Sequence, residues 1–261
     1  MKTLRKGSKG ELVEKWQNFL VGLGARIVAD GDFGENTRIA TVNFQKKYNL
    51  TADGVVGNTT YGKAMLLGFN VIEDDSSERN SADWPAFPGW WTPNDTDRKN
   101  MFGDLKFNHT PTATNKEKIT ITNGWDRENI VKTFVPQIKG KMFYNQVSSG
   151  EVLFHKKGVE QFLGMWEAWQ KAGLLSHVLT WNGSYCPRLI RGSDSRLSNH
   201  AYGTAFDINV KWNGLGRRPA LVGQEGSVRE LVPLANKYGF FWGGHYNNRK
   251  DGMHFELAKF V

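Results

Sequence analysis

Two histidines and one aspartate in the C-terminal part of the sequence have the types and spacing of metal ligands. His200 and Asp207 lie in SNHAYGTAFD, residues 198–207, and His254 follows in DGMHFE. Zinc prefers imidazole nitrogen and carboxylate oxygen, and a catalytic zinc site uses three protein ligands and a water. A short spacer followed by a long one is usual in metal sites, so the three residues predict a zinc site. Without His254, the pair is equally compatible with a structural hydrogen bond.

A metal site that cleaves amides also needs a carboxylate, which takes a proton from the attacking water and passes it to the leaving amine. Asp251, three positions before His254, is the best placed candidate. We expect His200 in a loop and Asp207 on a strand formed by TAFDINV, whose alternation puts Ala205, Asp207 and Asn209 on one face. Gly203 and Ala205 are small, and we expect them to leave room for the metal.

The remaining candidates for chemistry are weaker. His245, in WGGH, is a rival zinc ligand, although its setting is more typical of the wall of a substrate cleft. Glu256, two positions after His254, either orients that ligand or forms a plain salt bridge. Cys186 lacks the surroundings of a catalytic thiol. Three further histidines have no partner pattern and are predicted to be structural or exposed: His109, His155 and His177.

The elements expected around these residues alternate between short strands and helices. KITITNGW and SHVLTWNGSY have the composition of strands, whereas VEQFLGMWEAWQKAG and SVRELVPLANKYG have helical periodicity. The first of these helices carries one apolar stripe, which predicts a buried face: Phe162, Met165, Trp166 and Trp169. The fold class predicted for this region is α+β, with a central antiparallel sheet flanked by helices.

An internal repeat marks the first 70 residues. The pattern Asp30-Gly31-x-x-Gly34-x-x-Thr37 recurs 23 positions later as Asp53-Gly54-x-x-Gly57-x-x-Thr60. Each Asp-Gly pair suits a tight turn with positive φ at glycine, and each threonine lies where a helix would start. Leu12, Trp16 and Phe19, and then Ile39, Val42 and Phe44, follow a helical spacing. A small module of about three short helices is expected.

Residues 4–67 resemble the small peptidoglycan-binding modules through GSKGELVEKWQNFL, DGDFGENTRIATVNFQKKYNL and DGVVGNTTYGKAM. The resemblance implies that bacterial peptidoglycan is the partner and that the groove beside the Asp-Gly loops is the contact surface. The alternative is a helical cap that helps the larger domain to fold.

A domain boundary is predicted at residues 73–83, EDDSSERNSAD, which are polar and have no apolar periodicity. The expected division is a helical module at 1–72 and a catalytic domain at 84–261. The segment WPAFPGWWTPN that follows either forms an exposed aromatic platform for sugar or, as we favour, is buried as it wraps the start of the domain.

Residues 100–261 resemble the superfamily of D-alanyl-D-alanine carboxypeptidases and L-alanyl-D-glutamate endopeptidases. The family motifs SxHxxGxAxD and carboxylate-x-x-His stand here as SNHAYGTAFD and DGMH. The resemblance implies a Zn²⁺ cofactor held by His200, Asp207 and His254, with Asp251 as general base. Many carboxypeptidase members have Glu at the position of Asp251, and an Asp there resembles the endopeptidase branch.

The family also places an arginine before the first histidine, where it stabilises the oxyanion of the tetrahedral intermediate. Arg188, in SYCPR, is the residue that we assign to this role. Arg191 and Arg196 are competing candidates and are interpreted as surface or supporting residues.

The composition favours a soluble folded protein. The chain has 261 residues, 39% of them apolar, and 10 Trp, which is sufficient for a packed core. The net charge of +8 comes without a basic run or a stacked-aromatic motif, so nucleic acid is not expected as a partner. We find no membrane-spanning run and no signal peptide at the start, and the single Cys excludes an internal disulfide. We therefore expect synthesis in the host cytoplasm and a monomer that acts on the cell wall after release.

Together these features predict a modular phage endolysin that cleaves the stem peptide of peptidoglycan, at the L-alanyl-D-glutamate bond. Three alternatives remain open at this point: a D-alanyl-D-alanine carboxypeptidase, a secreted antibacterial effector, and a wall-binding protein without activity.

Overall fold

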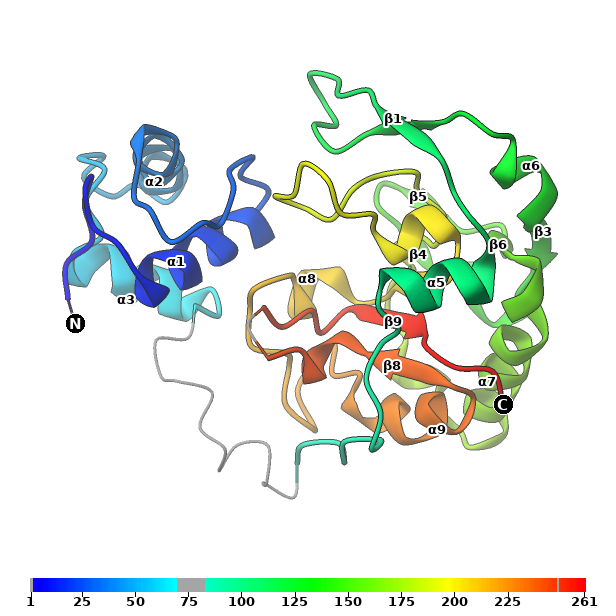
Figure 1. Ribbon diagram of the computed structural model, residues 1–261. Coiled ribbons are helices and arrows are strands. Elements are labelled where there is room, and N and C mark those ends of the chain that lie inside the picture. Colours follow the sequence, from blue (N-terminus) through cyan, green and yellow to red (C-terminus); the bar gives the residue numbers. More distant parts are fainter. Residues whose placement is uncertain (1, 70–82, 248) are drawn as a thin grey trace.

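The computed structural model describes residues 2–69, 83–247 and 249–261, which form two parts (Figure 1). We call residues 2–69 the N-terminal part and residues 83–261 the C-terminal part. The first is helical, and the second combines small antiparallel sheets with helices, as the sequence predicts. The predicted linker at 73–83 lies outside the described residues except for Asp83. None of the described helices has the length and apolar character needed to cross a membrane.

The N-terminal part consists of α1 (Glu11–Gly22), α2 (Glu35–Lys47) and α3 (Asn58–Leu66), packed around Trp16. This indole is fully buried, meets Phe44 edge-on at 5.4 Å, and donates its N–H to Thr41 Oγ1 at 2.9 Å. Ile39 departs from the expected apolar face, because 46% of its surface is exposed. The side of α2 that faces the core is instead formed by Ala40 and Phe44 with buried polar residues.

The repeated Asp-Gly loops are each organised by one buried glutamine. Gln17 Nε2 donates to Asp30 Oδ1, Asp32 O and Thr37 Oγ1, each at 2.9 Å, while Gln17 Oε1 accepts from the Gly31 N–H at 2.8 Å. Gln45 makes the same four contacts with the second loop. The predicted positive φ is present, at +74° for Gly31 and +75° for Gly54. The carboxylates of Asp30 and Asp53 therefore accept hydrogen bonds from residues of the N-terminal part itself.

The described residues of the C-terminal part form four small antiparallel sheets. Their strands are β1 (Phe107–His109) with β2 (Ile119–Ile121), β3 (Ile130–Phe134) with β6 (Glu151–His155), β4 (Met142–Phe143) with β5 (Gln146–Val147), and the three-stranded sheet β7 (Ala205–Asp207), β9 (His254–Leu257) and β8 (Phe240–Trp242). The helices are α5 (Asp95–Phe102), α6 (Trp125–Asn129), α7 (Val159–Lys171), α8 (Val210–Asn213) and α9 (Val232–Lys237).

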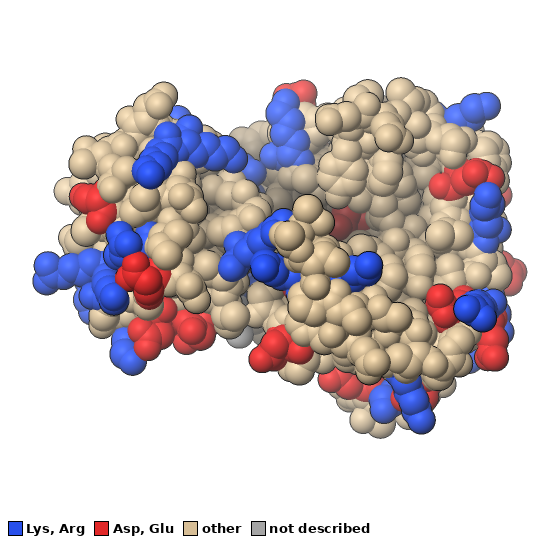
Figure 2. Space-filling model, turned by 90° about the horizontal axis from the view of Figure 1, so that it is seen from above, with Lys and Arg blue, Asp and Glu red and all other residues tan. Residues whose placement is uncertain are grey.

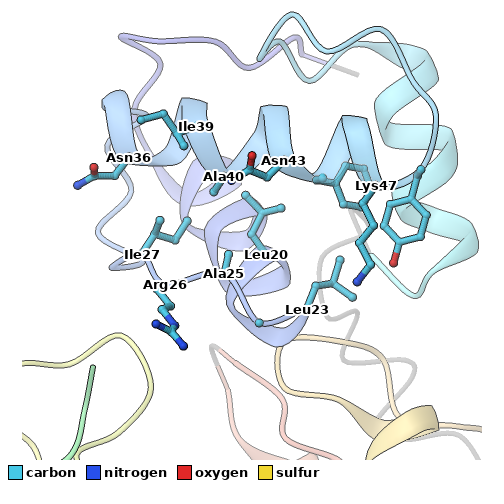
Figure 3. Close-up of a pocket in the computed structure, with 13 residues that line it drawn as sticks. Leu20, Leu23, Ala25, Arg26, Ile27, Asn36, Ile39, Ala40, Asn43 and Lys47 are labelled. Carbon is cyan, nitrogen blue, oxygen red and sulfur yellow. The ribbon is translucent and has the colours of Figure 1, made fainter. Parts of the chain in front are cut away.

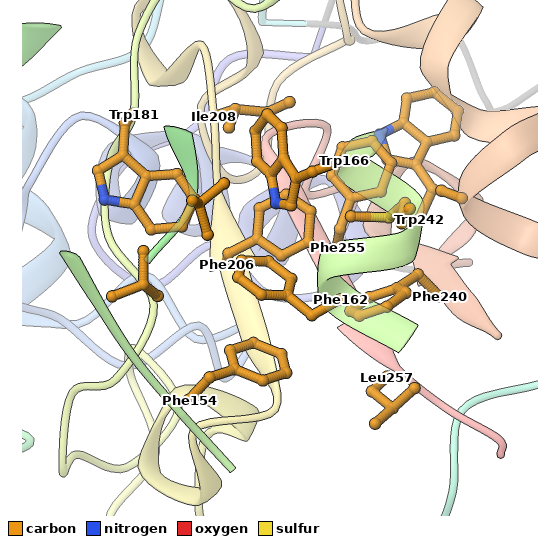
Figure 4. Packing of buried hydrophobic residues seen from close by; sticks show 14 of the residues in the cluster. Phe154, Phe162, Trp166, Trp181, Phe206, Ile208, Phe240, Trp242, Phe255 and Leu257 are labelled. Atoms are coloured by element: carbon orange, nitrogen blue, oxygen red, sulfur yellow. The ribbon is translucent and has the colours of Figure 1, made fainter. Parts of the chain in front are cut away.

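Helix α7 packs against the three-stranded sheet and confirms the predicted apolar stripe. All four stripe residues are fully buried. Phe206 of β7 and Phe255 of β9 stack at 5.4 Å in the middle of this core, and Phe162 approaches Phe206 at 5.3 Å (Figure 4). Burying a large apolar side chain stabilises the folded state by on the order of 1.5–3 kcal/mol. This cluster therefore fixes the positions of the three strands and of the residues at their ends.

One predicted strand is wrong. SHVLTWNGSY, residues 176–185, forms only isolated bridges at Thr180 and Trp181. The cause is a side chain: Asn209 Oδ1 accepts from the backbone N–H groups of Leu179 and Thr180, at 2.8 and 3.0 Å. At residues 179 and 180 an amide side chain therefore takes the place of a neighbouring strand, whereas residues 180–183 bond to the backbone of residues 207–209.

The aromatic segment after the predicted linker combines both interpretations. Trp84 is buried, with 5% of its surface exposed, and its ring packs against Trp242. The rings of Phe87 and Trp91 contact each other in a tilted arrangement, with centroids 4.8 Å apart, and remain 45% and 51% exposed. The segment therefore wraps the domain at its start and leaves an aromatic pair on the surface.

The two parts are in close contact. Leu215 belongs to the apolar cluster of the N-terminal part, and Met253 packs against it. A Cβ at Gly22 would lie 1.6 Å from the Leu215 carbonyl oxygen, so only glycine fits there. Arg26 donates to the Thr114 carbonyl at 2.7 Å. The contact thus combines apolar packing, close backbone approach and a hydrogen bond.

Candidate metal centre

Two of the three predicted zinc ligands, Asp207 and His254, lie at the ends of strands β7 and β9. Asp207 ends β7, His254 begins β9, and the two residues are direct cross-strand partners. His200 lies in a short 3-10 turn, Asn199–Tyr202, which begins where Ser198 Oγ accepts from the His200 N–H. Opposite residues on antiparallel strands have Cβ atoms about 5 Å apart, which brings Asp207 and His254 together.

The ligand atoms of these three residues form a small triangle. His254 Nδ1 lies 3.0 Å from Asp207 Oδ1, and His200 Nε2 lies 3.2 Å from each of these two atoms. Tetrahedral zinc with bonds of about 2.0–2.2 Å would separate its ligand atoms by roughly 3.3 Å. The observed triangle therefore has the size of one face of a zinc tetrahedron. Among the described residues this is the group that can hold a metal ion.

Each imidazole is oriented by its other nitrogen. His200 Nδ1 lies 2.6 Å from the Ser184 carbonyl oxygen, so it carries the proton and leaves Nε2 free for a metal. His254 Nε2 lies 3.6 Å from Glu256 Oε2, so Nδ1 faces the triangle. Tyr246 O–H donates to Glu256 Oε1 at 2.8 Å. Outer partners of this kind are the usual support of metal-binding histidines.

The electrostatics of the triangle keep its carboxylate ionised. Burial favours neutral Asp207, but the two histidines outweigh it and hold the pKa of Asp207 well below its usual range. Burial also opposes a charge on His254, yet the neighbouring carboxylates of Asp207 and Glu256 raise the pKa of His254 to about 10. For His200 burial prevails and lowers the pKa. Positive charge is thus favoured beside Asp207, which is the condition that suits a cation.

Asp251 lies beside the triangle in the loop before β9. Burial, reinforced by the charge of Asp207, raises the pKa of Asp251 to about 7, although His254, Arg249 and Arg188 oppose the shift. Its Oδ1 is buried and has no hydrogen-bond partner among the described residues. A carboxyl group with a pKa near neutrality is suited to accept and return a proton.

The three candidate arginines have different settings. Arg188 is half-buried, donates to the Leu189 carbonyl at 3.1 Å, and its charge reaches both His200 and Asp251. Arg191 instead pairs with Glu117 at 2.7 Å, and Arg196 is exposed. Of the three, Arg188 has the setting that suits contact with a substrate at the triangle.

Other predicted candidates lie elsewhere. His245 is buried among aromatic rings, its Nδ1 accepts from Trp84 Nε1 at 3.3 Å, and it is not part of the metal-binding group found among the described residues. Gly203 leaves room for Ile130 and the His155 backbone, not for a metal, since its Cβ would lie 2.6 Å from Ile130 Cδ1. His155 is fully buried, and Cys186 is a free thiol.

Two exposed or half-buried histidines complete the set. His109 Nε2 lies 2.7 Å from the Lys116 carbonyl oxygen, and His177 Nδ1 lies 3.7 Å from Glu230 Oε2. Both have local structural partners, as expected of histidines without a functional pattern.

A separate cleft of about 450 Å³ lies in the N-terminal part, between the end of α1 and α2 (Figure 3). Its walls are apolar, with Leu20, Leu23 and Ile39 among them, and Asn43 and Lys47 add polar groups. None of the residues of the two Asp-Gly pairs lines it. The cleft also accounts for the exposure of Ile39, which faces open space here.

Two family models match separate stretches of the chain. Residues 191–257 match the family model described as D-alanyl-D-alanine carboxypeptidase, and residues 9–63 match a peptidoglycan binding domain. The first match contains His200, Asp207, Asp251 and His254, whereas Arg188 lies just outside it. Two separate stretches of the chain are thus similar to these two families.

Two curated relatives are similar over short stretches. The chain is 37% identical to the zinc D-Ala-D-Ala carboxypeptidase of Streptomyces albus G over 81 residues, 30% of this chain and 30% of that protein. It is 42% identical to a probable N-acetylmuramoyl-L-alanine amidase of Bacillus licheniformis over 60 residues, 22% and 17% of the two chains. The chain thus spans less than a third of the length of either relative.

Solved structures are similar to part of the chain as well. A peptidoglycan-binding protein from Clostridioides difficile is 44% identical over 24% of this chain and 40% of its own, with a TM-score of 0.24. The Burkholderia AP3 phage endolysin is 34% identical over 28% of each chain, with a TM-score of 0.25.

Proposed function

We propose that this protein is a zinc-dependent peptidase that cleaves the stem peptide of bacterial peptidoglycan. The observation that carries the proposal is the triangle of His200, Asp207 and His254 ligand atoms, whose edges of 3.0–3.2 Å fit one face of a zinc tetrahedron. The family matches support the same reading, because the triangle lies within the carboxypeptidase segment and a wall-binding segment precedes it.

The roles of the side chains follow from their settings. Bound zinc supplies Lewis acidity, which polarises the amide carbonyl and makes an attacking water more acidic. Asp251 accepts the proton of that water and returns it to the leaving amine, for which its raised pKa is suited. Arg188 stabilises the negative charge that develops on the carbonyl oxygen. Glu256 holds the His254 ring in place.

Two scissile bonds are supported by different observations. We propose the L-alanyl-D-glutamate bond, because Asp251 stands where many carboxypeptidase members have Glu. The second candidate, the terminal D-alanyl-D-alanine bond, is supported by the match of residues 191–257. Mass spectrometry of digested, purified peptidoglycan distinguishes the two. A new free amino group on D-glutamate supports the first, and released D-alanine supports the second.

We propose that the N-terminal part, within a module at residues 1–72, holds the wall through the cleft between α1 and α2. Apolar walls with a few polar groups are typical of ligand sites, and this cleft has Asn43 and Lys47 beside Leu20 and Ile39. Tethering to an insoluble polymer raises the effective substrate concentration of the peptidase. Asn43→Ala should reduce pelleting of the protein with purified walls and leave cleavage of soluble peptides unchanged. Equal pelleting would argue that the cleft is not the contact.

Metal analysis of variants tests the roles at the centre. We expect His200→Ala and His254→Ala to lose zinc, whereas Asp251→Ala keeps zinc and loses turnover by about 10²–10⁴-fold. A metal-free Asp251→Ala protein would mean that the roles are misassigned. A zinc-loaded wild type without activity on any wall would favour a wall-binding protein with a vestigial site.

We further propose that the protein acts as a phage endolysin, as a monomer, after release from the cytoplasm of its host. Expression in a bacterial host together with a membrane-permeabilising protein should cause lysis, and expression alone should not. Lysis of neighbouring cells by intact producing cells would instead indicate an exported antibacterial effector.

A further inference from the structure

A second cleft, of about 250 Å³, lies where the two parts meet. We call it the junction cleft. It is built from both parts: Glu14 and Asn18 come from α1, Arg191 and Arg196 from the loop before His200, and Arg249 from the loop before β9. In Figure 2, Lys and Arg side chains gather at the centre of this face, where the smaller part meets the larger. The walls therefore carry three arginines and one glutamate.

The positive charge of the junction cleft is only partly balanced. Arg191 is paired with Glu117, and Arg249 donates to Asn18 Oδ1 and to the Arg191 carbonyl oxygen, at 3.4 and 2.8 Å. Arg196 makes no side-chain hydrogen bond or ion pair with any described residue. Burial, together with the charge of Arg188, lowers the pKa of Arg249. A negatively charged group would thus be bound favourably in this cleft.

Two segments of the chain connect the junction cleft to the surroundings of the metal centre. Residues 188–198 form a hairpin-like loop, in which the Ser198 N–H donates to the Arg188 carbonyl and the Ile190 N–H donates to the Arg196 carbonyl. Arg196 precedes Ser198, the partner of Arg188, by two positions, and two residues of extended chain cover about 7 Å. On the other side, Arg249 precedes Asp251 by two positions.

We infer that the junction cleft binds a carboxylate of the substrate peptide, two to four residues from the scissile bond. One extended residue spans about 3.5 Å, so two to four residues of substrate cover roughly 7–14 Å from the scissile amide. The N-terminal part then forms one wall of the peptidase site, in addition to holding the wall polymer. This inference rests on the proposed peptidase function.

The test uses soluble stem peptides, so that attachment to walls has no influence. Each peptide of the series has a different single carboxylate converted to its amide. For the wild-type protein, one such amidation should raise KM about tenfold, because a charge-assisted hydrogen bond is lost. Arg196→Gln should raise KM for the free carboxylate by a similar factor and should abolish the discrimination at that position. Arg127→Gln, which removes an exposed arginine of α6, is the matched control.

A second variant tests the wall that comes from the N-terminal part. Glu14→Gln removes the one negative charge among the residues lining the cleft, so it should lower KM for the free carboxylate two- to threefold. A merely structural role for this residue would not improve binding. Calorimetry on the inactive Asp251→Asn variant measures the same preferences without turnover.

Two outcomes would overturn the inference. The first is that the wild type cleaves the peptides, but no amidation raises its KM more than the same amidation raises the KM of Arg196→Gln. This result would exclude a carboxylate subsite. An effect of Arg196→Gln only on walls that carry phosphate polymers would assign the cleft to those polymers. A wild type that cleaves neither peptides nor walls would instead refute the proposed peptidase function.

Discussion

Glu256 offers a sharp test of how the metal centre is supported. Its Oε2 lies 3.6 Å from His254 Nε2, its side chain is 1% exposed, and its Oε1 accepts from the Tyr246 hydroxyl. Glu256→Gln keeps the shape of the side chain and removes its charge. Loss of an outer partner typically weakens metal binding 10–100-fold. Glu256 also favours the protonated imidazole that competes with zinc, so we expect the lower limit, about tenfold or 1.4 kcal/mol.

The assay is zinc affinity at fixed pH, measured by competition with a chromophoric chelator. Tyr246→Phe removes only the donor to Glu256 Oε1, and we expect it to weaken zinc binding by about two- to threefold. Glu117→Gln is the matched control, because Glu117 is also a buried glutamate but pairs with Arg191. An unchanged zinc affinity in a correctly folded Glu256→Gln protein would refute the reasoning, since Glu256 would then be a plain salt-bridge partner.

Three further predictions concern stability and the contact between the parts. Gln17→Leu removes four hydrogen bonds of the first Asp-Gly loop and should cost about 2–4 kcal/mol in urea unfolding; a loss below 1 kcal/mol would contradict the role given to this glutamine. Gly22→Val would clash with the Leu215 carbonyl, so limited proteolysis should cut more rapidly between the parts, and unchanged cutting would contradict the packing. Burial lowers the pKa of His155 to about 4, below its unfolded value, so stability present above about pH 6.5 is lost as pH falls toward 4, by up to about 3 kcal/mol. His155→Gln should flatten that slope, and an equal slope in both proteins would exclude this cause.

The features that sequence predicts well are those determined by local chemistry or by strong periodicity. The stripe from Phe162 to Trp169 could be predicted because its spacing matches a helix and its residues are large and apolar. The turns at Gly31 and Gly54 could be predicted because positive φ favours glycine. His200 and Asp207 could be paired because one short segment carries both.

The features that sequence does not reveal depend on partners far along the chain. Gln17 and Gln45 are unremarkable helix residues until the loops that they hold have folded against them. The repeat period of 23 residues does not relate them, because Gln17 and Gln45 lie 28 positions apart. Asn209 replaces a strand partner for residues 179–180, which no local propensity indicates. Gly203 is small because of Ile130, from a different sheet, and not because of the metal.

The contact between the two parts bears on how their functions can be separated. Leu215 is 9% exposed as part of the apolar cluster of the N-terminal part, and Met253, which packs on the same cluster, directly precedes His254. Arg249 and Asp251 lie in the loop that Met253 ends, and Arg249 donates to Asn18 of α1. Deleting residues 1–72 would therefore expose apolar surface and release one side of the loop that carries the proposed base. Lower activity of such a truncated protein on soluble peptides would thus reflect a disturbed centre as well as a lost tether. Point variants that keep both parts, such as Asn43→Ala and Arg196→Gln, distinguish the two effects because they leave this packing intact.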